Sequence, residues 1–191
     1  MSQSASAPIE GLRNPGLGRV VAIIQARMGS SRFPGKTLAD LGGRPLLWHV
    51  VDRVKRSLTL DDVLVATSDL TSDDPIAGFC GDIGIQCFRG SEDDVLDRFF
   101  HAAEQASADA IVRITADCPL IDPAVIDRVV ARFSEGDLDY ASNCLHYTYP
   151  DGLDVEVFSF AALKRAWREA FKNSDREHVT PFLRTSDFRI Q

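Results

Sequence analysis

The chain has 191 residues, of which 45% are hydrophobic and 26% are charged, a balance typical of a globular protein with one buried core. Its formal net charge of −7 argues against a general affinity for nucleic acid, because such binding neutralises many phosphates. There is no apolar run of the roughly 20 residues that a membrane-spanning helix needs, and no apolar secretory signal, so we expect a cytoplasmic protein without a membrane partner.

The chain divides into a short tail and one domain. Residues 1–18 are rich in serine, alanine, proline and glycine without periodicity, so we expect a disordered tail there and a single domain over residues 19–191. Short apolar runs then alternate with segments of helical apolar spacing. In chain order they predict a strand at 20–25, a helix from 45 to about 57, a strand at 62–67, a helix near 75–80, a strand at 85–89, a helix at 95–103, a strand at 110–115, a helix from 123, and strands at 138–142 and 154–158.

This alternation predicts an α/β fold, a three-layer α/β/α sandwich with a mostly parallel sheet. In such sheets, ligands bind beyond the carboxyl ends of the strands. We therefore expect the functional site just after the strands at 20–25 and 110–115.

A basic loop follows the first strand. Residues 27–36 read RMGSSRFPGK, with three cations among two glycines and two serines. Glycine lets a backbone approach a ligand closely, and arginine and lysine form charge-assisted hydrogen bonds with phosphate oxygens. At the ligand-binding end of a buried strand in an acidic chain, this composition predicts a triphosphate site rather than a solvated turn.

Two familiar phosphate-binding motifs do not fit the loop. Gly35-Lys36-Thr37 matches the end of the Walker motif GxxxxGK[ST], but five residues separate Gly29 from Gly35 where that motif has four. Pro34 also constrains the backbone where a Walker loop curls. The dinucleotide fingerprint GxGxxG does not follow this strand.

Carboxylates near two strands predict a metal site at the same edge. Asp117 lies just past the strand at 110–115. A strand period of two puts Asp154 and Glu156 on one face, so we expect these two carboxylates to point together into a site. Magnesium binds one or two carboxylates together with phosphate oxygens, so Asp117 and Asp154 are the expected Mg²⁺ ligands, and Glu156 is a candidate for the acceptor site.

Three further polar residues suit a ligand site. Arg113 stands among apolar neighbours in a strand, where an arginine must be paired or reach the ligand edge; it binds the base or a phosphate, or it holds Asp117 in place. Asp69 follows a buried strand and is placed to contact the nucleoside. His178 belongs either to the acceptor site or to a solvated helix. Capping and the helix dipole explain the acidic residues that begin the next helix, so these are left outside the site: Glu92, Asp93 and Asp94.

Two runs of the sequence, IIQARMGSSRFPGKTL and GGRPLLWHVVDRV, resemble the signature of the cytidylyltransferase family that makes CMP-activated acidic sugars. The resemblance covers residues 20–191 and is strongest for the branch of spore coat polysaccharide biosynthesis proteins, the SpsF-like proteins. Later segments carry it in order: ATSD, RGSEDDVLDRF, RITADCPLID, YPDGLDVEVF and REHVTPF.

The resemblance implies a fold of the nucleotide-diphospho-sugar transferase type, GT-A and Rossmann-like, with CTP as donor, a divalent metal and a sugar acceptor. It also implies metal-binding aspartates in the segments of Asp117 and Asp154, and it suits a homodimer. Members of the family usually continue for several tens of residues past REHVTPF, so we expect a C-terminus truncated relative to theirs.

The residues expected to bind the nucleotide come from the basic loop and the strand ends: Gln25, Ala26, Arg27, Met28, Gly29, Ser30, Arg32, Lys36, Asp69 and Arg113. Lys36, Arg27 and Asp117 are expected to take part in catalysis. In the predicted reaction a sugar oxygen attacks the α-phosphate of CTP and pyrophosphate leaves in line, while cations and metal neutralise the developing charge. The predicted function is cytidylyl transfer to an acidic sugar or a sugar phosphate in polysaccharide or surface-glycan biosynthesis.

Two other functions are alternatives. A GT-A glycosyltransferase would take a sugar nucleotide as donor, but that class usually carries a DxD-type metal motif at a strand end, and the DLD string at 137–139 precedes a predicted strand. A non-catalytic nucleotide-binding module is the third interpretation. Tight nucleotide binding without turnover would distinguish the module from an enzyme.

Overall fold

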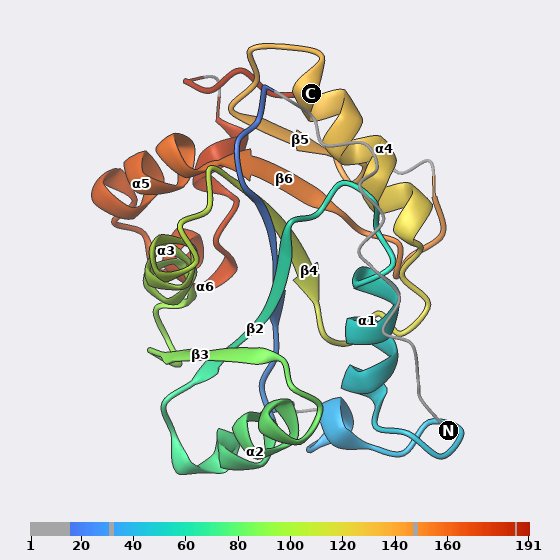
Figure 1. Cartoon of the computed structure of the whole chain (residues 1–191). Coiled ribbons are helices and arrows are strands. Elements are labelled where there is room, and N and C mark those ends of the chain that lie inside the picture. Colours follow the sequence, from blue (N-terminus) through green and yellow to red (C-terminus); the bar gives the residue numbers. More distant parts are fainter. Residues whose placement is uncertain (1–15, 31–32, 147–148, 186) are drawn as a thin grey trace.

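The computed structural model describes residues 16–30, 33–146, 149–185 and 187–191, so most of the predicted tail lies outside the described residues. Within these ranges the chain forms a six-stranded mixed sheet in the order β3-β2-β1-β4-β6-β5 (Figure 1). Strands β3, β2, β1 and β4 run parallel to one another, whereas β6 is antiparallel to both β4 and β5. The strands are β1 (Val20–Gln25), β2 (Asp62–Ser68), β3 (Gln86–Gly90), β4 (Ala110–Thr115), β5 (Tyr140–Ser142) and β6 (Glu156–Ser159).

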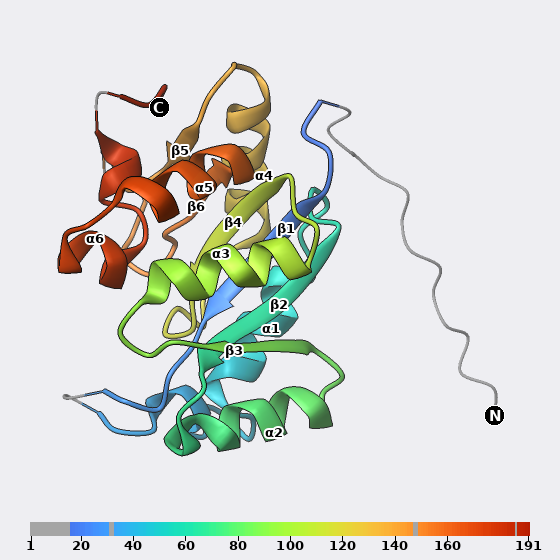
Figure 2. The ribbon, with the colours of Figure 1, turned by 90° about the vertical axis from the view of Figure 1, so that its left-hand side faces the viewer.

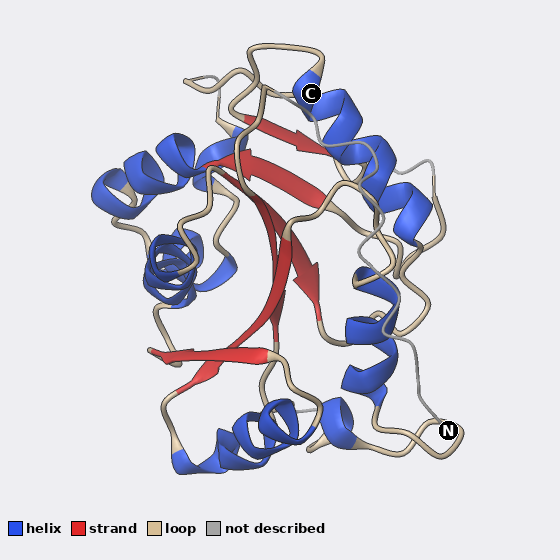
Figure 3. Cartoon of the chain, viewed as in Figure 1, coloured by secondary structure: helices blue, strands red, loops and turns tan. Residues whose placement is uncertain are grey.

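Helices cover both faces of the sheet and complete the three predicted layers (Figure 3). Side chains of β1 alternate between the two faces: Ala22 and Ile24 pack on one side, and Val21 and Ile23 on the other. This arrangement confirms the prediction of a strand that is buried on both faces. The first face carries α1 (Leu46–Val54), α2 (Asp74–Asp82) and α4 (Pro123–Ser134), and the second, nearest the viewer in Figure 2, carries α3 (Val95–Gln105), α5 (Phe160–Glu169) and α6 (Asn173–His178).

The predicted helices form, and α1 is shorter than predicted. α4 begins at Pro123, as predicted. α1 ends at Val54 rather than near Ser57, because the following turn is held from outside the helix. Asp127 Oδ1 accepts hydrogen bonds from the hydroxyls of Ser57 and Thr59 at 2.6 and 2.8 Å. A turn fixed in this way leads the chain into β2.

β6 begins at Glu156 rather than at the predicted Asp154. Ahead of it, the side chain of Asn143 takes the place of the strand ladder: its Nδ2 donates to the Leu153 carbonyl at 2.8 Å, and its Oδ1 accepts from the Val155 N–H at 2.9 Å. Asp154 therefore lies in a segment that leads into the strand. The alternation of side chains along a strand therefore does not place Asp154 on the same face as Glu156.

The C-terminal part contains elements that the sequence pattern did not predict. The buried side of α5 consists largely of small residues, Ala162 and Ala166 with Leu163, which give a weak apolar signal. β5 is also shorter than the predicted strand at 138–142. In the described part of the chain, no helix is long and apolar enough to cross a membrane.

Candidate active site

The basic loop leaves the carboxyl end of β1 and turns back on itself. The Gly35 N–H donates to the Met28 carbonyl at 3.0 Å, and Thr37 Oγ1 donates to the Arg27 carbonyl at 2.8 Å. Gly35 has a φ of 74°, a left-handed conformation that favours glycine. A short 3₁₀ helix, η1 (Lys36–Leu38), starts at the next residue, so the lysine returns to the sheet edge from which the loop departs.

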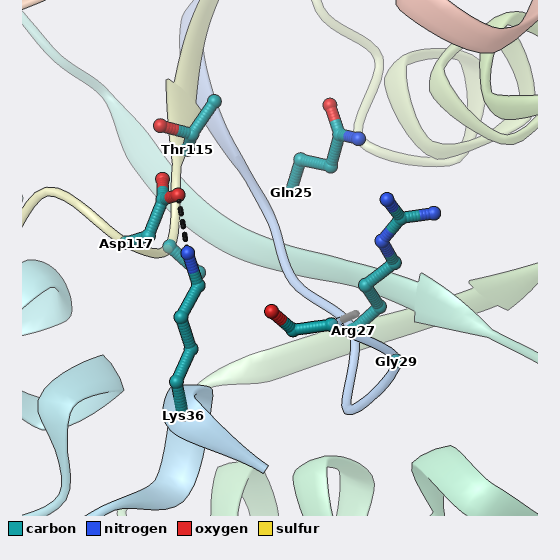
Figure 4. A pocket seen from close by; sticks show the side chains of 8 residues that line it. Gln25, Arg27, Gly29, Lys36, Thr115 and Asp117 are labelled. Atoms are coloured by element: carbon teal, nitrogen blue, oxygen red, sulfur yellow. Dashed lines mark hydrogen bonds and ion pairs between the residues drawn. The ribbon is translucent and has the colours of Figure 1, made fainter. Parts of the chain in front are cut away.

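Lys36 forms an ion pair with Asp117 at this edge (Figure 4). Its Nζ lies 2.8 Å from Asp117 Oδ2, just beyond the end of β4, the strand that neighbours β1. Burial acts to raise the pKa of Asp117, but hydrogen bonds from Lys36 and Thr115 outweigh it and lower the pKa below its usual value. Asp117 is thus a carboxylate at neutral pH, and it is paired with a cation that the sequence predicts to bind phosphate.

A cavity of about 250 Å³ lies between the loop and the ends of β1 and β4, and we call it the central cavity (Figure 4). Thr115 and Ala116 line it, although the sequence analysis did not select them. They belong to the run RITADCPLID, so the signal was the motif rather than their own chemistry. The remaining lining residues are all predicted ones: Gln25, Arg27, Gly29, Ser30, Lys36 and Asp117.

Several predicted nucleotide-binding residues lie elsewhere. Ala26 is buried in the core, and the Met28 side chain packs against that core, so any contact of theirs with a ligand would come from the backbone. Asp69 is exposed after β2, where its N–H donates to the Gly90 carbonyl at 2.8 Å. Arg32 lies outside the described residues. Contacts of Asp69 and Arg32 with the nucleotide stay predictions.

Two further cavities adjoin the central one. The first, of about 460 Å³, shares Arg27 with it and is called the Arg176 cavity; its other lining residues are Glu92, Asp93, Asp94, Asn173, Arg176 and Glu177. The second, of about 490 Å³, shares Thr115 and Asp117 and is called the Asp154 cavity; its other lining residues are Cys118, Pro119, Leu120, Asp151, Gly152 and Asp154. Arg27 and Asp117 therefore stand at two boundaries of the central cavity.

The Arg176 cavity contains acidic residues that the sequence analysis left outside the site. Asp94 caps α3 as predicted, since its Oδ1 accepts from the Asp97 N–H at 2.9 Å. Its Oδ2 also accepts from Arg176 Nε at 3.0 Å and Nη2 at 2.5 Å, which ties α6 to α3. Glu92 and Asp93 line the same cavity. Capping alone is thus an incomplete account of these residues.

Asp117 and Asp154 border one cavity because β6 runs opposite to β4. Arg113 on β4 is the register partner of Glu156 on β6, so residues beyond the end of β4 lie across from residues ahead of the start of β6. Two carboxylates far apart in sequence are brought to the same place. They form the pair that the sequence analysis selected for a metal.

The expectation that Asp154 and Glu156 point together into one site is not met. Glu156 is 4% exposed and forms ion pairs with Arg113 through Oε2 and with Arg184 through Oε1, the latter at 2.5 Å. The Tyr140 hydroxyl donates to the same Oε1 at 2.6 Å. Burial acts to raise the pKa of Glu156, but the charge of Arg113 and the hydrogen bonds from Tyr140 and Arg184 outweigh it and lower the pKa to about 2. Both oxygens of this carboxylate are engaged within the core.

Arg113 is paired, as expected for an arginine in a buried strand. Besides Glu156, its guanidinium contacts Gln25: Nη2 donates to Gln25 Oε1 at 3.1 Å. Because a guanidinium offers only donors, this contact fixes the amide oxygen of Gln25 as the acceptor. Figure 4 shows Gln25 across that cavity from Lys36. Arg113 therefore orients a lining residue.

His178 is exposed at the end of α6, outside the lining of the three cavities. The next residue, Val179, is fully buried at a φ of 68°, and the Thr180 N–H donates to the His178 carbonyl at 2.8 Å. This tight turn is strained for a β-branched residue, and such strain concentrates at functional sites. The acceptor-site role of His178 stays a prediction.

Three features meet at one edge of the sheet. They are the basic loop after β1, the Lys36–Asp117 pair after β4, and Asp154 ahead of β6. A model of the cytidylyltransferase family matches residues 21–191. The chain belongs to the cytidylyltransferase family. Its mixed sheet with helices on both faces is the α/β, Rossmann-like arrangement of nucleotidyltransferases, so the predicted fold class and family are confirmed.

Three individual proteins show what the chain is similar to, two at the level of sequence and one at the level of fold. It is 38% identical over 181 residues to the spore coat polysaccharide biosynthesis protein SpsF of Bacillus subtilis, covering 90% of this chain and 73% of SpsF. A cytidylyltransferase structure from Leptospira borgpetersenii aligns with a TM-score of 0.85 at 34% identity, covering 90% of this chain and 74% of that one. CMP:2-keto-3-deoxy-manno-octonic acid synthetase complexed with CTP shares the fold, with a TM-score of 0.72 at 20% identity and coverage of 91% and 88%.

Proposed function

We propose that the chain transfers the cytidylyl group of CTP to a sugar and releases pyrophosphate. The observation that carries the proposal is the Lys36–Asp117 pair, which puts a phosphate-binding cation 2.8 Å from a carboxylate in a cavity lined by a glycine-containing basic loop. A nucleoside triphosphate matches this concentration of positive charge in an acidic chain. Membership of the cytidylyltransferase family supports CTP as the donor.

The phosphates would occupy the central cavity. Lys36 and Arg27 supply charged donors, and Gly29 and Ser30 supply backbone N–H groups and a hydroxyl from the loop. Gln25 adds amide N–H groups from the opposite wall. Charge-assisted donors held in fixed positions stabilise a phosphoryl group as its charge redistributes in the transition state.

Asp117 and Asp154 fit a divalent metal, and we propose Mg²⁺. The two aspartates offer carboxylate oxygens, and the lowered pKa of Asp117 keeps it ionised. Mg²⁺ is bound through one or two carboxylates together with phosphate oxygens and water, which suits a pair of aspartates beside a phosphate cavity. When bound, such an ion supplies charge neutralisation at the reacting phosphate.

The reaction balances without a further reactant. An acceptor oxygen forms a bond to the α-phosphorus, the bond from that phosphorus to the bridging oxygen breaks, and pyrophosphate leaves with the electron pair. A sugar phosphate enters as an anion, whereas a sugar hydroxyl releases its proton to water as the new bond forms. Lys36 and Arg27 balance the negative charge that grows on the departing pyrophosphate.

The flanking cavities accommodate the two ends of the reaction. We assign the nucleoside to the Arg176 cavity, where Glu92 and Asp93 can accept hydrogen bonds from an exocyclic amine. We assign the sugar to the Asp154 cavity, where Asp151 can accept from hydroxyl groups. The similarity to SpsF supports an acidic sugar or sugar phosphate of polysaccharide or surface-glycan synthesis as the acceptor, and we propose a homodimer as the assembly.

The test is pyrophosphate release with each of the four ribonucleoside triphosphates, Mg²⁺, and a panel of acidic sugars and sugar phosphates. Wild type is compared with Asp117→Ala and with Asp137→Ala, whose side chain is 92% exposed and which belongs to the DLD string. Release with CTP alone, dependent on one acceptor, lost in the first variant and kept in the second, supports the proposal. CTP binding without release would favour a non-catalytic module, and turnover of a sugar nucleotide lost with Asp137 would favour a glycosyltransferase.

A further inference from the structure

Asp73 is a buried carboxylate that lies outside the lining of the central cavity. It ends a short 3₁₀ helix, η2 (Thr71–Asp73), that follows β2, and it is 2% exposed. Its Oδ2 accepts from the hydroxyls of Ser68 and Thr67 at 2.6 and 3.0 Å and from the Ser68 N–H at 3.2 Å. These contacts fix the carboxylate to the end of β2.

The second oxygen of Asp73 leaves its own segment and reaches the basic loop. Oδ1 accepts from the Met28 N–H at 2.8 Å, across 45 positions of sequence. The Met28 carbonyl in turn accepts from the Gly35 N–H at 3.0 Å. Both backbone groups of Met28 are thus held, the N–H by Asp73 of η2 and the carbonyl by Gly35 at the far end of the loop. Gly29 and Ser30, which line the central cavity, follow directly.

The surroundings of Asp73 favour its charged form. A buried carboxylate is costly unless hydrogen bonds compensate for lost hydration. Burial acts to raise the pKa of Asp73, but hydrogen bonds from Ser68, Met28 and Thr67 outweigh it and lower the pKa.

A buried arginine, Arg98, adds a positive charge near Asp73. Arg98 is 1% exposed, donates to the Ser91 carbonyl at 2.9 Å and keeps an Nε without a partner among the described residues. Burial lowers the pKa of this arginine, and the charge of Asp73 opposes that effect.

We propose that Asp73 is a positioning residue for the phosphate loop. By accepting a hydrogen bond from the Met28 N–H, Asp73 fixes the position of Met28, where the two ends of the loop meet. It thereby sets the positions of the Arg27 side chain and of the N–H groups after Met28 relative to the phosphates. The proposal rests on the proposed function, because it assumes that a triphosphate occupies the central cavity. It adds a residue that touches neither nucleotide nor sugar.

Asp127 provides a matched control for a purely structural carboxylate. Its Oδ1 accepts four hydrogen bonds, from the hydroxyl and N–H groups of the turn at Ser57, Leu58 and Thr59, at 2.6 to 3.2 Å. That turn precedes β2, at the amino ends of the strands, whereas the central cavity lies at the carboxyl ends. Asp127→Asn should therefore cost stability without touching the loop.

The experiment compares wild type, Asp73→Asn and Asp127→Asn in three measurements: denaturant unfolding, calorimetric titration with CTP and Mg²⁺, and hydrogen exchange at the amides of residues 28–30, 33, 35 and 36. In Asp73→Asn an amide NH₂ replaces the oxygen that accepts from the Ser68 N–H. Two donors then face each other, and the side chain is held less firmly. We expect both variants to lose stability, but only Asp73→Asn to exchange faster in the loop and to bind CTP about tenfold more weakly.

Unchanged loop exchange and unchanged CTP affinity in Asp73→Asn would overturn the proposal. If wild type binds no triphosphate, the proposed function fails, but the exchange measurement still decides whether Asp73 holds the loop. If Asp73→Asn does not fold, Ser68→Ala replaces it, since that variant removes the shortest contact to Oδ2 and keeps the carboxylate. Faster loop exchange in Ser68→Ala than in Asp127→Asn then supports the proposal, and equal exchange overturns it.

Discussion

Lys36 Nζ lies 2.8 Å from Asp117 Oδ2, so the cation proposed to bind phosphate and the carboxylate proposed to bind metal neutralise each other. A triphosphate and a metal ion would each attract one member of this pair. The ion pair therefore opposes the binding of either ligand alone and is replaced when both bind. Both partners are partly exposed, which limits the strength of the pair.

Lys36→Met should separate these two effects. We expect the variant to bind Mn²⁺ about fivefold more tightly in the absence of nucleotide, because a partly exposed ion pair that competes for Asp117 is worth about 1 kcal/mol. Its kcat/KM with CTP should fall about 100-fold through loss of a phosphate donor. Lys164→Met, on the exposed side of α5, is the control. Unaltered metal affinity in Lys36→Met, measured by calorimetry, would contradict this account.

Glu156→Gln should destabilise the fold by about 3 kcal/mol at pH 7, because it leaves the partly buried Arg113 without its counter-ion. Glu135→Gln is the comparison, since Glu135 pairs with Arg132 at 2.6 Å on the surface and should cost less than about 1 kcal/mol. Denaturant unfolding measures both. Equal losses in the two variants would show that burial of the Glu156 pair carries no special weight.

The same carboxylate predicts how stability depends on pH. The pKa of Glu156 falls from an ordinary value of 4.5 to about 2 in the folded chain. Because the folded pKa is depressed, the stabilisation is fully present above pH 4.5 and is lost as the pH falls toward 2, and its size is about 3 kcal/mol. Across this window the free energy of unfolding should fall more steeply with decreasing pH in wild type than in Glu156→Gln. Parallel curves would contradict the assignment.

Two glycine substitutions should have opposite signs. Gly35→Ala places a side chain at a φ of 74°, and we expect a loss of about 1 kcal/mol together with weaker CTP binding. An added Cβ would meet Met28 Cε only at 3.5 Å, so backbone conformation rather than crowding causes the loss. Gly78→Ala, inside α2 with open space around it, should stabilise by about 0.5 to 1 kcal/mol. Thermal unfolding of the two variants tests the signs.

Asn143→Ala should disturb the approach of Asp154 to its cavity. The substitution removes two hydrogen bonds to the backbone on either side of Asp154, so we expect a loss of about 1 to 2 kcal/mol and a weaker apparent affinity for Mg²⁺. Ser134→Ala, which removes a bond to the Ala131 carbonyl in α4, is the control and should leave the Mg²⁺ dependence unchanged. If both variants need the same Mg²⁺ concentration as wild type, Asn143 does not position Asp154.

Local patterns were sufficient to predict the first half of the fold and most of the residues that line the central cavity. β1 is an uninterrupted apolar run, and the loop after it concentrates glycine and cations within ten residues, so both signals lie in one short stretch. The Lys36–Asp117 neighbourhood followed from a general rule, because the ends of adjacent parallel strands meet at one sheet edge. Their direct contact at 2.8 Å was beyond that rule.

Residues whose roles depend on distant partners could not be predicted. In the sequence, Asp73 is only a polar residue ahead of a helix. Its contact with Met28 forms when the fold brings the end of β2 next to the loop. Alternation alone grouped Glu156 with Asp154, because a sequence does not state where a strand begins. Hydrogen bonds from the Asn143 side chain set that boundary. Arg113 and Arg184 then form ion pairs with Glu156 within the core.

The reversed direction of β6 has a consequence for how the site assembles during folding. The basic loop and Asp117 depend on β1 and β4 in the parallel part of the sheet, whereas Asp154 arrives only when β6 adds to the edge of β4. An opening of the β5–β6 edge would therefore separate the two aspartates and leave the phosphate loop intact. Local unfolding at that edge would then release the metal without disturbing the loop that binds phosphate.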